Sequence, residues 1–472
     1  MAGRTGVTAT RSCGLLSLLM RARVLAALTA AVLLGTGTAV PAAQAAPGAQ
    51  AAPAGRAAPA AMPHPVLAGP AAPLAAARAP VPCPKAPAPK VSRPPRPVPP
   101  PNVPADRVVG GERLDTPGLV TPDGAPAPPA VTATSWLVAD LDTGAVLGAC
   151  GPHEYATPAS TQKLLLAAAM LPRLDPKQVV TATRGDLDIE PGSSAVGLLV
   201  GGKYTVETVW LGLLLNSGNE AANLLARLGG GADGVPGGVR AMNEEARRLG
   251  ARQTHAVTPS GLDGKGQFTS AYDLALIARA CFANPLFRRY ARTEHAQIPA
   301  QPALKKGGFQ IQNDNQLLYH YPGALGGKTG FTDLARHSYV GAAERDGRRL
   351  VVTLLGAESR PIRGWQQGAK LLDWGFSLPG DASVGRLVEP GELDEAEAAA
   401  SNSPAAPTPA PPPQWRGPAG TALRRMADGD WRVIVSTAGI LALAVGGLVA
   451  ALVVRRGRPR RVGRRRAGRR RA

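Results

Sequence analysis

The sequence predicts an α+β fold in the middle of the chain, between two segments rich in alanine and proline. Three observations lead to this prediction: a β-hairpin pattern opens the region, helical patterns fill it, and two β-rich runs with a final helix close it. Because strand patterns stand at both ends, we expect one sheet built from segments far apart in the sequence. The predicted domain spans 131–386, a common size for a single domain.

The opening hairpin is predicted from two apolar runs, 136–138 and 145–147, which flank the turn sequence Asp142-Thr143-Gly144. Apolar periodicity then predicts a series of helices, at 160–170, 206–215, 220–228, 238–249 and 270–281. The closing β-rich runs are 338–342 and 349–355, and the final helix covers 364–374. These elements are expected to pack around one core.

The flanking segments 46–130 and 387–430 are predicted to be linkers. The first is rich in alanine and proline, and the second is acidic at its start and proline-rich afterwards. Such compositions bury too little apolar surface to fold and favour extended, polyproline-like chain.

The two ends of the chain predict export and a membrane anchor. Residues 1–45 combine arginines, a short apolar run and an A-x-A pattern, which is typical of a secretory signal peptide. Within a predicted transmembrane helix at 431–454, residues 433–454 carry no charge and are long enough to cross about 30 Å of bilayer. The arginine-rich tail 455–472 is expected in the cytoplasm, beside anionic lipid headgroups. The expected location is therefore the cell membrane, single-pass, with 131–386 extracytoplasmic.

The net charge of +20 suggests nucleic-acid binding only at first sight. Eleven arginines lie in 455–472 and four in 1–45, and neither segment has an acidic residue, so the rest of the chain carries only +5. A nucleic-acid partner is therefore not expected.

The cysteines leave one question open. Cys13 lies in the predicted signal peptide, so Cys83, Cys150 and Cys281 remain. Cys150 and Cys281 fall in the predicted domain, where they either pair or stay as buried thiols.

Metal and nucleotide sites are not predicted. The sequence has no HExxH or HxxxH pair, no zinc-type cysteine spacing, no G-x-S-x-G elbow and no Walker or Rossmann loop. His255 and His337 lie inside the domain as single histidines, which are more often structural. We therefore expect neither a metal nor a cofactor.

The clearest chemical pattern is Ser160-x-x-Lys163, which occurs once in the chain. Helical spacing places the two side chains on one face, one turn apart. A serine hydroxyl needs a base to become a good nucleophile, and a lysine can be that base only if burial or another cation lowers its pKa. The apolar run after Lys163 provides such burial. Alone, this short pattern is weak.

Two further patterns follow in order. Ser217-Gly218-Asn219 lies between two predicted helices, and Lys328-Thr329-Gly330 leads towards a predicted strand. By itself, the Ser217 pattern is also typical of a helix cap with a turn, and the Lys328 pattern of the start of a surface strand. Together with the serine and lysine pair, they form the S-x-x-K, S-x-N and K-T-G set.

This set resembles that of penicillin-binding proteins, and in particular of the low-molecular-weight, serine-type D-alanyl-D-alanine carboxypeptidases. The resemblance covers nearly all of 133–378 and includes the residues around the motifs. Residues 158–164 are similar to the family's P-A-S-x-x-K-L, 204–222 to its Y-T-V-E-D-L … S-G-N-D-A-A, 258–263 to its N-P-H-G-L, and 321–332 to its Y-P-G … G-x-K-T-G-F-T. It implies a penicillin-binding-protein/β-lactamase-like fold: an antiparallel sheet flanked by helices, with a helical subdomain.

The resemblance also implies roles for the motif residues. Ser160 would attack the carbonyl between two D-alanines, and Lys163 would be its base. Ser217 would pass a proton to the leaving amine, in a network held by Lys328. The remaining roles are substrate binding by Asn219, Lys328, Thr329 and Gly330, and an oxyanion hole from the backbone amides of Ser160 and Phe331.

Three residues depart from the family pattern. Glu220 replaces an aspartate, Ser260 replaces a frequent histidine, and Arg336 stands where a glycine is common. None of them is a nucleophile, base or substrate clamp, so the departures bear on substrate preference.

The resulting prediction is a membrane-anchored D-Ala-D-Ala carboxypeptidase that trims peptidoglycan stem peptides and is inhibited by penicillin. One alternative is a β-lactamase, although 220–327 contains no E-x-x-L-N string of the class A type. Another is a non-catalytic β-lactam sensor or wall-binding protein, although the eighteen-residue tail is too short for a signalling domain. Substrate turnover distinguishes the enzyme from the second alternative.

Overall fold

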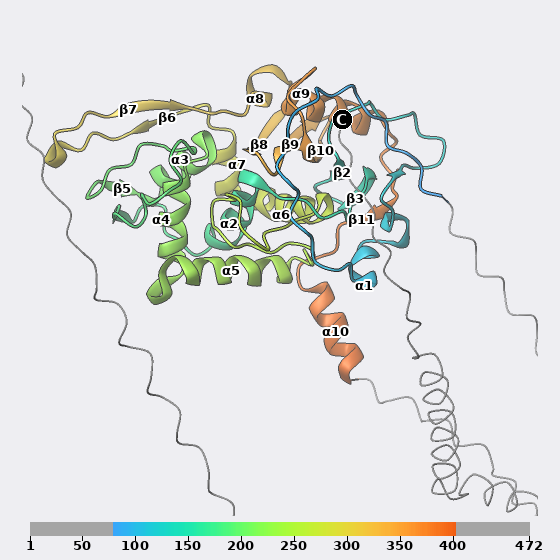
Figure 1. The fold of residues 1–472 in the computed structure, drawn as a ribbon, viewed down its shortest axis with the longest axis horizontal. Helices are drawn as coiled ribbons and strands as arrows, with labels where there is room; N and C mark the ends of the chain where they lie inside the picture. Colours follow the sequence, from blue (N-terminus) through green and yellow to red (C-terminus); the bar gives the residue numbers. More distant parts are fainter. Residues whose placement is uncertain (1–78, 403–472) are drawn as a thin grey trace, which may run out of the picture. The chain divides into compact units, whose positions relative to one another are not determined.

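The computed structural model describes residues 79–402 and confirms the predicted α+β fold. Its main sheet is antiparallel and seven-stranded, in the order β1-β3-β2-β10-β9-β8, with β11 pairing with β3 (Figure 1). As predicted, the early strand β2 pairs with the late strand β10. The strands of this sheet are β1 (Leu119–Val120), β2 (Ser135–Asp140), β3 (Ala145–Cys150), β8 (Ala324–Thr332), β9 (Arg336–Arg345), β10 (Arg348–Ala357) and β11 (Gly385–Arg386).

Helices cover both faces of this sheet (Figure 1). On one face α6 packs on β2 and β10, with the other helices of the subdomain behind it, and on the opposite face α9 packs on β9 and β10. The helices are α1 (Pro104–Arg107), α2 (Lys163–Met170), α3 (Val206–Asn216), α4 (Asn219–Gly229), α5 (Gly234–Arg248), α6 (Ala271–Ala283), α7 (Pro285–Ala291), α8 (Leu317–His320), α9 (Gly364–Ser377) and α10 (Glu392–Asn402).

The central strands are buried on both faces, and this explains why their sequences are continuously apolar. In β2, Leu137 and Ala139 join the core beneath the helical subdomain, whereas Trp136 and Val138 join the core beneath α9. Side chains alternate between faces along a strand, so one apolar run supplies two cores. The predicted helices 206–215, 220–228, 238–249, 270–281 and 364–374 are present with small shifts of their ends.

Two small antiparallel sheets were not expected from the sequence. One pairs β4 (Val179–Thr181) with β5 (Lys203–Thr205), and the other pairs β6 (His295–Ile298) with β7 (Phe309–Gln312). Their strands are three or four residues long, too short to give a clear alternating pattern.

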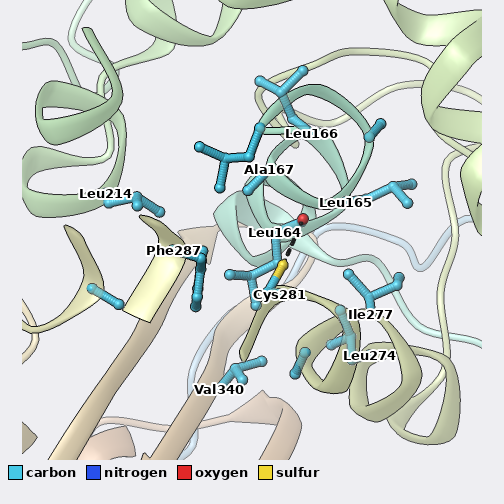
Figure 2. Close-up of a cluster of buried hydrophobic side chains, with 14 of the residues drawn as sticks. Leu164, Leu165, Leu166, Ala167, Leu214, Leu274, Ile277, Cys281, Phe287 and Val340 are labelled. Carbon is cyan, nitrogen blue, oxygen red and sulfur yellow. Dashed lines mark hydrogen bonds between the residues drawn. The ribbon is translucent and has the colours of Figure 1, made fainter. Parts of the chain in front are cut away.

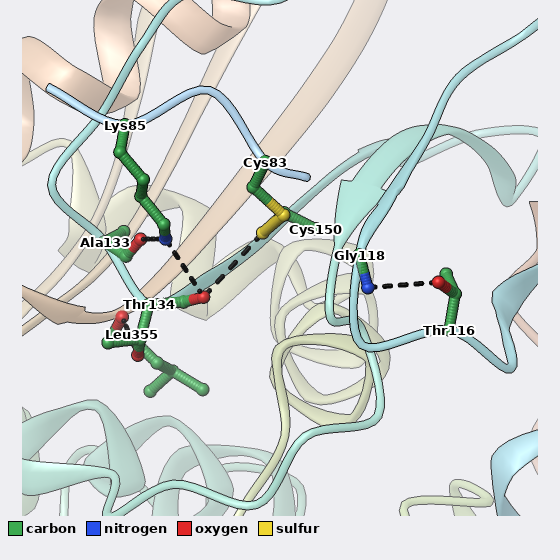
Figure 3. Close-up of a disulfide and its surroundings, with 8 residues drawn as sticks. All are labelled: Cys83, Lys85, Thr116, Gly118, Ala133, Thr134, Cys150 and Leu355. Atoms are coloured by element: carbon green, nitrogen blue, oxygen red, sulfur yellow. Dashed lines mark hydrogen bonds between the residues drawn. A yellow bond between two sulfur atoms is a disulfide. The ribbon is translucent and has the colours of Figure 1, made fainter. Parts of the chain in front are cut away.

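Residues 79–103 form no helix or strand apart from a bridge at Lys85, but the prediction of an extended linker over 46–130 is wrong for 104–120. This segment contains α1, a 3₁₀ turn at Glu112–Leu114 and strand β1, which pairs with β3. A disulfide joins Cys83 to Cys150 (Figure 3). The alternative of a Cys150–Cys281 pair is therefore wrong, and the alternative of buried thiols holds for Cys281 but not for Cys150. Proline-rich composition did not prevent this segment from packing, because the disulfide and the sheet hold it.

The predicted linker 387–430 also begins with structure. Its acidic start forms α10, and Asp394 and Glu397 of this helix pair with Arg252. The predicted signal peptide (1–45), transmembrane helix (431–454) and arginine-rich tail (455–472) lie outside the described residues. Within 79–402, none of the helices combines the length and apolarity needed to span a bilayer.

Candidate active site

Ser160 lies in a tight turn rather than in the predicted α-helix. The turn is the 3₁₀ helix η2 (Ala159–Gln162), and α2 begins only at Lys163. Ala159 has a positive φ of 48°, a conformation that alanine rarely adopts. The hydroxyls of Thr161 and Ser338 both donate to the Pro158 carbonyl, each at 2.6 Å, and so fix the start of the turn. The turn leaves Ser160 only partly buried.

Lys163 is completely buried at the first position of α2. Its Nζ lies 2.9 Å from Ser160 Oγ, 2.7 Å from Asn219 Oδ1 and 2.7 Å from the Ser260 carbonyl oxygen. Burial, assisted by the positive charge of Lys328, holds the pKa of Lys163 well below its usual value, while Glu220 acts in the opposite direction. Asn219, which the resemblance assigns to substrate binding, thus also contacts Lys163.

The apolar cluster around α2 is the cause of this burial (Figure 2). Leu164, Leu165 and Leu166 are at most 1% exposed and pack between the other helices of the subdomain. The Cys281 thiol donates to the Leu164 carbonyl at 3.2 Å, which ties α6 to the first turn of α2. Water is thereby kept from one side of Lys163. Loss of hydration destabilises the charged ammonium more than the neutral amine, which lowers the pKa of Lys163.

The Ser217-Gly218-Asn219 motif joins two helices, as predicted. Ser217 ends α3 in the left-handed conformation, with a φ of 61°, and Asn219 begins α4. Gly218 is required between them, because a Cβ there would lie 2.3 Å from a methyl group of Val196. The Ser217 hydroxyl is buried and has no hydrogen-bond partner among the described residues.

Lys328 lies in the middle of β8 and is only 2% exposed. Its Nζ donates to the Thr329 carbonyl at 2.7 Å, and no hydrogen bond joins it to Ser217 in the described part of the chain. Burial lowers the pKa of Lys328 to about 8, and the carboxylate of Asp314 limits the decrease. Lys328 therefore keeps most of its charge at pH 7.

Strand β8 passes directly over the turn that holds Ser160. A Cβ on Gly330 would lie 2.3 Å from Ser338 Oγ and 2.8 Å from the backbone nitrogen of Ser160, so only glycine allows this approach. The next residue, Phe331, is 49% exposed at the rim. The backbones of the two predicted oxyanion-hole residues, Ser160 and Phe331, are thus brought to the same place.

The structure therefore brings the three motifs together around Ser160, from a turn, a helix junction and a strand. Sequence reasoning missed four contributors. The Ser260 carbonyl binds Lys163, Asp314 acts on Lys328, and the Glu220 carboxylate accepts from the backbone amides of Val196 and Gly197 at 2.7 and 2.8 Å. The fourth is Arg336, whose φ of 58° shows why glycine is common there. Ser260, Glu220 and Arg336 were noted in the sequence only as departures from the family pattern.

Comparisons with known proteins agree with this geometry. Residues 123–359 match the family described as D-alanyl-D-alanine carboxypeptidase. The D-alanyl-D-alanine carboxypeptidase DacB2 of Mycobacterium tuberculosis is 45% identical over 273 residues, which cover 57% of this chain and 90% of that protein. DacD of Salmonella typhimurium, also named a D-alanyl-D-alanine carboxypeptidase, is 35% identical over 53% of this chain and 64% of its own.

Solved structures give the same picture. A crystal structure of a D-alanyl-D-alanine carboxypeptidase from Mycobacterium tuberculosis matches with a TM-score of 0.53 and 44% identity, over 57% of this chain and all of that one. A Streptomyces DD-transpeptidase matches with a TM-score of 0.51 and 29% identity, over 53% of this chain and 99% of that one. These relatives favour a peptidase over the β-lactamase alternative.

Proposed function

Because the chain belongs to the D-alanyl-D-alanine carboxypeptidase family and is a serine-type peptidase, we propose that it removes the terminal D-alanine from peptidoglycan stem peptides through an ester on Ser160. β-Lactams would acylate the same hydroxyl. The observation that carries this proposal is the set of contacts around the buried amine of Lys163.

These contacts fit a neutral amine, which has two N–H donors and one lone pair. Asn219 Oδ1 and the Ser260 carbonyl oxygen are acceptors, and they match the two donors. The lone pair then remains for the hydroxyl of Ser160 at 2.9 Å. A proton can pass from Ser160 to Lys163 as the oxygen attacks, which is the role of a general base.

The remaining steps are assigned to the other motif residues. Ser160 Oγ forms a bond to the carbonyl carbon, the bond to the D-alanine nitrogen breaks, and that nitrogen receives the proton from Lys163 by way of Ser217. Water then hydrolyses the ester and regenerates the serine. The buried, otherwise unpartnered hydroxyl of Ser217 supports its role as the relay.

Substrate binding is assigned to the strand β8. The charge of Lys328 and the hydroxyl of Thr329 suit the terminal carboxylate of the peptide. The backbone amides of Ser160 and Phe331 suit the oxyanion, because the close approach at Gly330 brings these two segments together.

The function is tested by labelled penicillin and by D-alanine release from a pentapeptide, with the full-length protein. We expect one covalent adduct on Ser160, D-alanine release that penicillin blocks, and neither in Ser160→Ala. Ser401→Ala, on the exposed end of α10, is the matched control and should behave as wild type. An adduct on another residue, or steady penicillin hydrolysis without D-alanine release, would contradict the proposal.

For location, we propose a single-pass membrane protein with the domain outside the cytoplasm and the arginine tail against anionic lipid. The charge-free run 433–454 and the eleven arginines after it support this. Truncation at Ala427 should release active protein into the medium. Truncated protein that stays with the membrane after removal of the signal peptide would show a different anchor.

A further inference from the structure

Two arginines from distant parts of the chain meet at one buried carboxylate. Glu358 directly follows β10, and its side chain is 3% exposed. Arg336 donates to it from Nε at 3.1 Å and from Nη2 at 3.2 Å, and Arg93 donates to the oxygen Oε1. Burial would raise the pKa of Glu358, but the hydrogen bonds and charges of Arg336 and Arg93 outweigh it and keep the pKa below its usual value.

Arg336 connects this carboxylate to the active-site strand. It is the first residue of β9 and pairs with Thr332 of β8, while the neighbouring His337 pairs with Phe331. Its guanidinium lies over the Phe331 ring, 5.1 Å from the centroid, and the rings of Phe331 and His337 are 4.7 Å apart. A change at Arg336 therefore reaches the residue whose backbone amide is assigned to the oxyanion hole.

Arg336 holds an unfavourable backbone conformation, with a φ of 58°. A residue other than glycine keeps such a conformation only where its surroundings fix it. Here the fixed surroundings are the double hydrogen bond to Glu358 and the contact with the Phe331 ring. The backbone of Glu358 is itself fixed, because its N–H donates to Thr132 Oγ1 at 2.9 Å and its carbonyl accepts from the same hydroxyl at 3.1 Å.

Arg93 comes from the N-terminal segment, which is attached to the sheet ten residues earlier. Cys83 is bonded to Cys150 of β3, and Lys85 donates to the carbonyl oxygens of Ala133 and Thr134 at 2.5 and 3.3 Å (Figure 3). We call residues 83–93 the N-terminal strap. The strap starts at the disulfide and ends at Arg93, whose guanidinium contacts Glu358 directly after β10.

We propose that Arg93 is a positioning residue for catalysis: through Glu358 and Arg336 it holds Phe331 of β8 in place, which makes the N-terminal strap a working part of the active site. The proposal rests on the function proposed above. Glu358 Oε1 receives both guanidinium groups, so each arginine restricts the orientation of the carboxylate that the other one binds. Without Arg93, Glu358 gains freedom, and the strained Arg336 loses part of what fixes it.

The test is a double-mutant cycle in the full-length protein, read as the rate of Ser160 acylation by penicillin per acylatable enzyme and as kcat and KM for a pentapeptide. Arg93→Ala should lower acylation and kcat about two- to fivefold, the size expected when a partly exposed ion pair is lost. KM should change little, because Arg93 touches no group assigned to the substrate. Arg93→Lys should restore part of the rate.

Arg336→Gly supplies the second arm of the cycle, because glycine accepts a φ of 58° without strain and should leave the fold intact. We expect this variant to be slower than Arg93→Ala, by about five- to tenfold relative to wild type, since a small displacement of a group at the reacting centre is costly. Adding Arg93→Ala to Arg336→Gly should have no further effect. Arg96→Ala is the matched control: Arg96 is exposed and has no salt bridge within 79–402.

The outcomes are distinct. Equal effects of Arg93→Ala in both backgrounds, or an effect on the melting temperature with an unchanged rate per acylatable enzyme, would show a structural role and overturn the inference. A wild-type protein that neither binds penicillin at Ser160 nor releases D-alanine would overturn the proposed function, and the inference with it.

Discussion

The helical side of the active site and its sheet edge each carry a buried lysine, and their surroundings differ in one respect. Lys163 at the start of α2 contacts only neutral acceptors: a hydroxyl, an amide oxygen and a backbone carbonyl. Lys328 in β8 is almost as deeply buried. A carboxylate acts on each lysine, Glu220 on Lys163 and Asp314 on Lys328, but Lys163 is also opposed by the positive charge of Lys328. The pKa of Lys163 is accordingly held well below its usual value, whereas that of Lys328 falls only to about 8.

The difference shows how one residue type serves two purposes within one site. Desolvation acts on both ammonium groups and a carboxylate opposes it in each case, but at Lys163 the positive charge of Lys328 has a larger effect than the carboxylate of Glu220. Lys163, whose pKa is lowered further by a neighbouring cation, is suited to accept a proton, and Lys328, whose charged neighbour is a carboxylate, is suited to bind an anion. The charge of Lys328 thus contributes to the lowered pKa of Lys163.

The largest expected effect is on the acylation rate when each of the two lysines is replaced by arginine. Lys163→Arg should reduce acylation by penicillin about a thousandfold, within the range typical for loss of a general base, because a guanidinium stays protonated. Lys328→Arg keeps the positive charge, so its acylation rate should fall far less than that of Lys163→Arg. Stopped-flow acylation of both variants measures the contrast.

Circular dichroism is the control for this pair, since both substitutions enlarge a buried side chain. A folded Lys163→Arg enzyme that acylates nearly as fast as wild type would exclude Lys163 as the base, and the two lysines would then have to exchange roles.

A smaller effect is expected from removing the charge at the sheet edge. Lys328→Gln should lower kcat/KM for the pentapeptide about ten- to hundredfold, mainly through KM, which corresponds to about 1.5–3 kcal/mol for a hydrogen bond to a charged group. Steady-state kinetics with the peptide and with its C-terminal amide test this. The amide lacks the carboxylate. If the substitution lowers kcat/KM for the amide as much as for the peptide, Lys328 does not bind that carboxylate.

The smallest effect concerns the pH profile. Activity should fall with acid, as Lys163 becomes protonated, and should fall again above about pH 8, as Lys328 loses its proton. Asp314 raises the pKa of Lys328, so Asp314→Asn should move the alkaline limb to lower pH. We expect the activity of Asp314→Asn to be about two- to fivefold lower than that of wild type near pH 8 and little changed at pH 6. The estimate uses about 1.4 kcal/mol for one pKa unit. An alkaline limb that does not move would mean that Asp314 does not tune Lys328.

The regular elements and the chemical motifs could be predicted from the sequence because they are local. Two apolar runs with a turn between them gave β2 and β3, and the spacing of Ser160 and Lys163 predicted that their side chains meet, although not that Ser160 precedes the helix. The missed 3₁₀ turn at Ser160 has a tertiary cause. β8 crosses it so closely that Gly330 has no room for a Cβ, and no local signal reports that approach.

By itself, the sequence determined the α+β order of elements, the pairing of Ser160 with Lys163, and the family, since each depends on residue types at short spacing. Only the tertiary structure decided which charged groups act on each lysine, that Cys83 rather than Cys281 pairs with Cys150, and that Arg93 reaches Glu358 across 265 positions. The physical reason is the same in all three cases. Charge interactions and covalent pairing depend on distance in space, and a chain that folds back on itself makes that distance independent of separation in sequence.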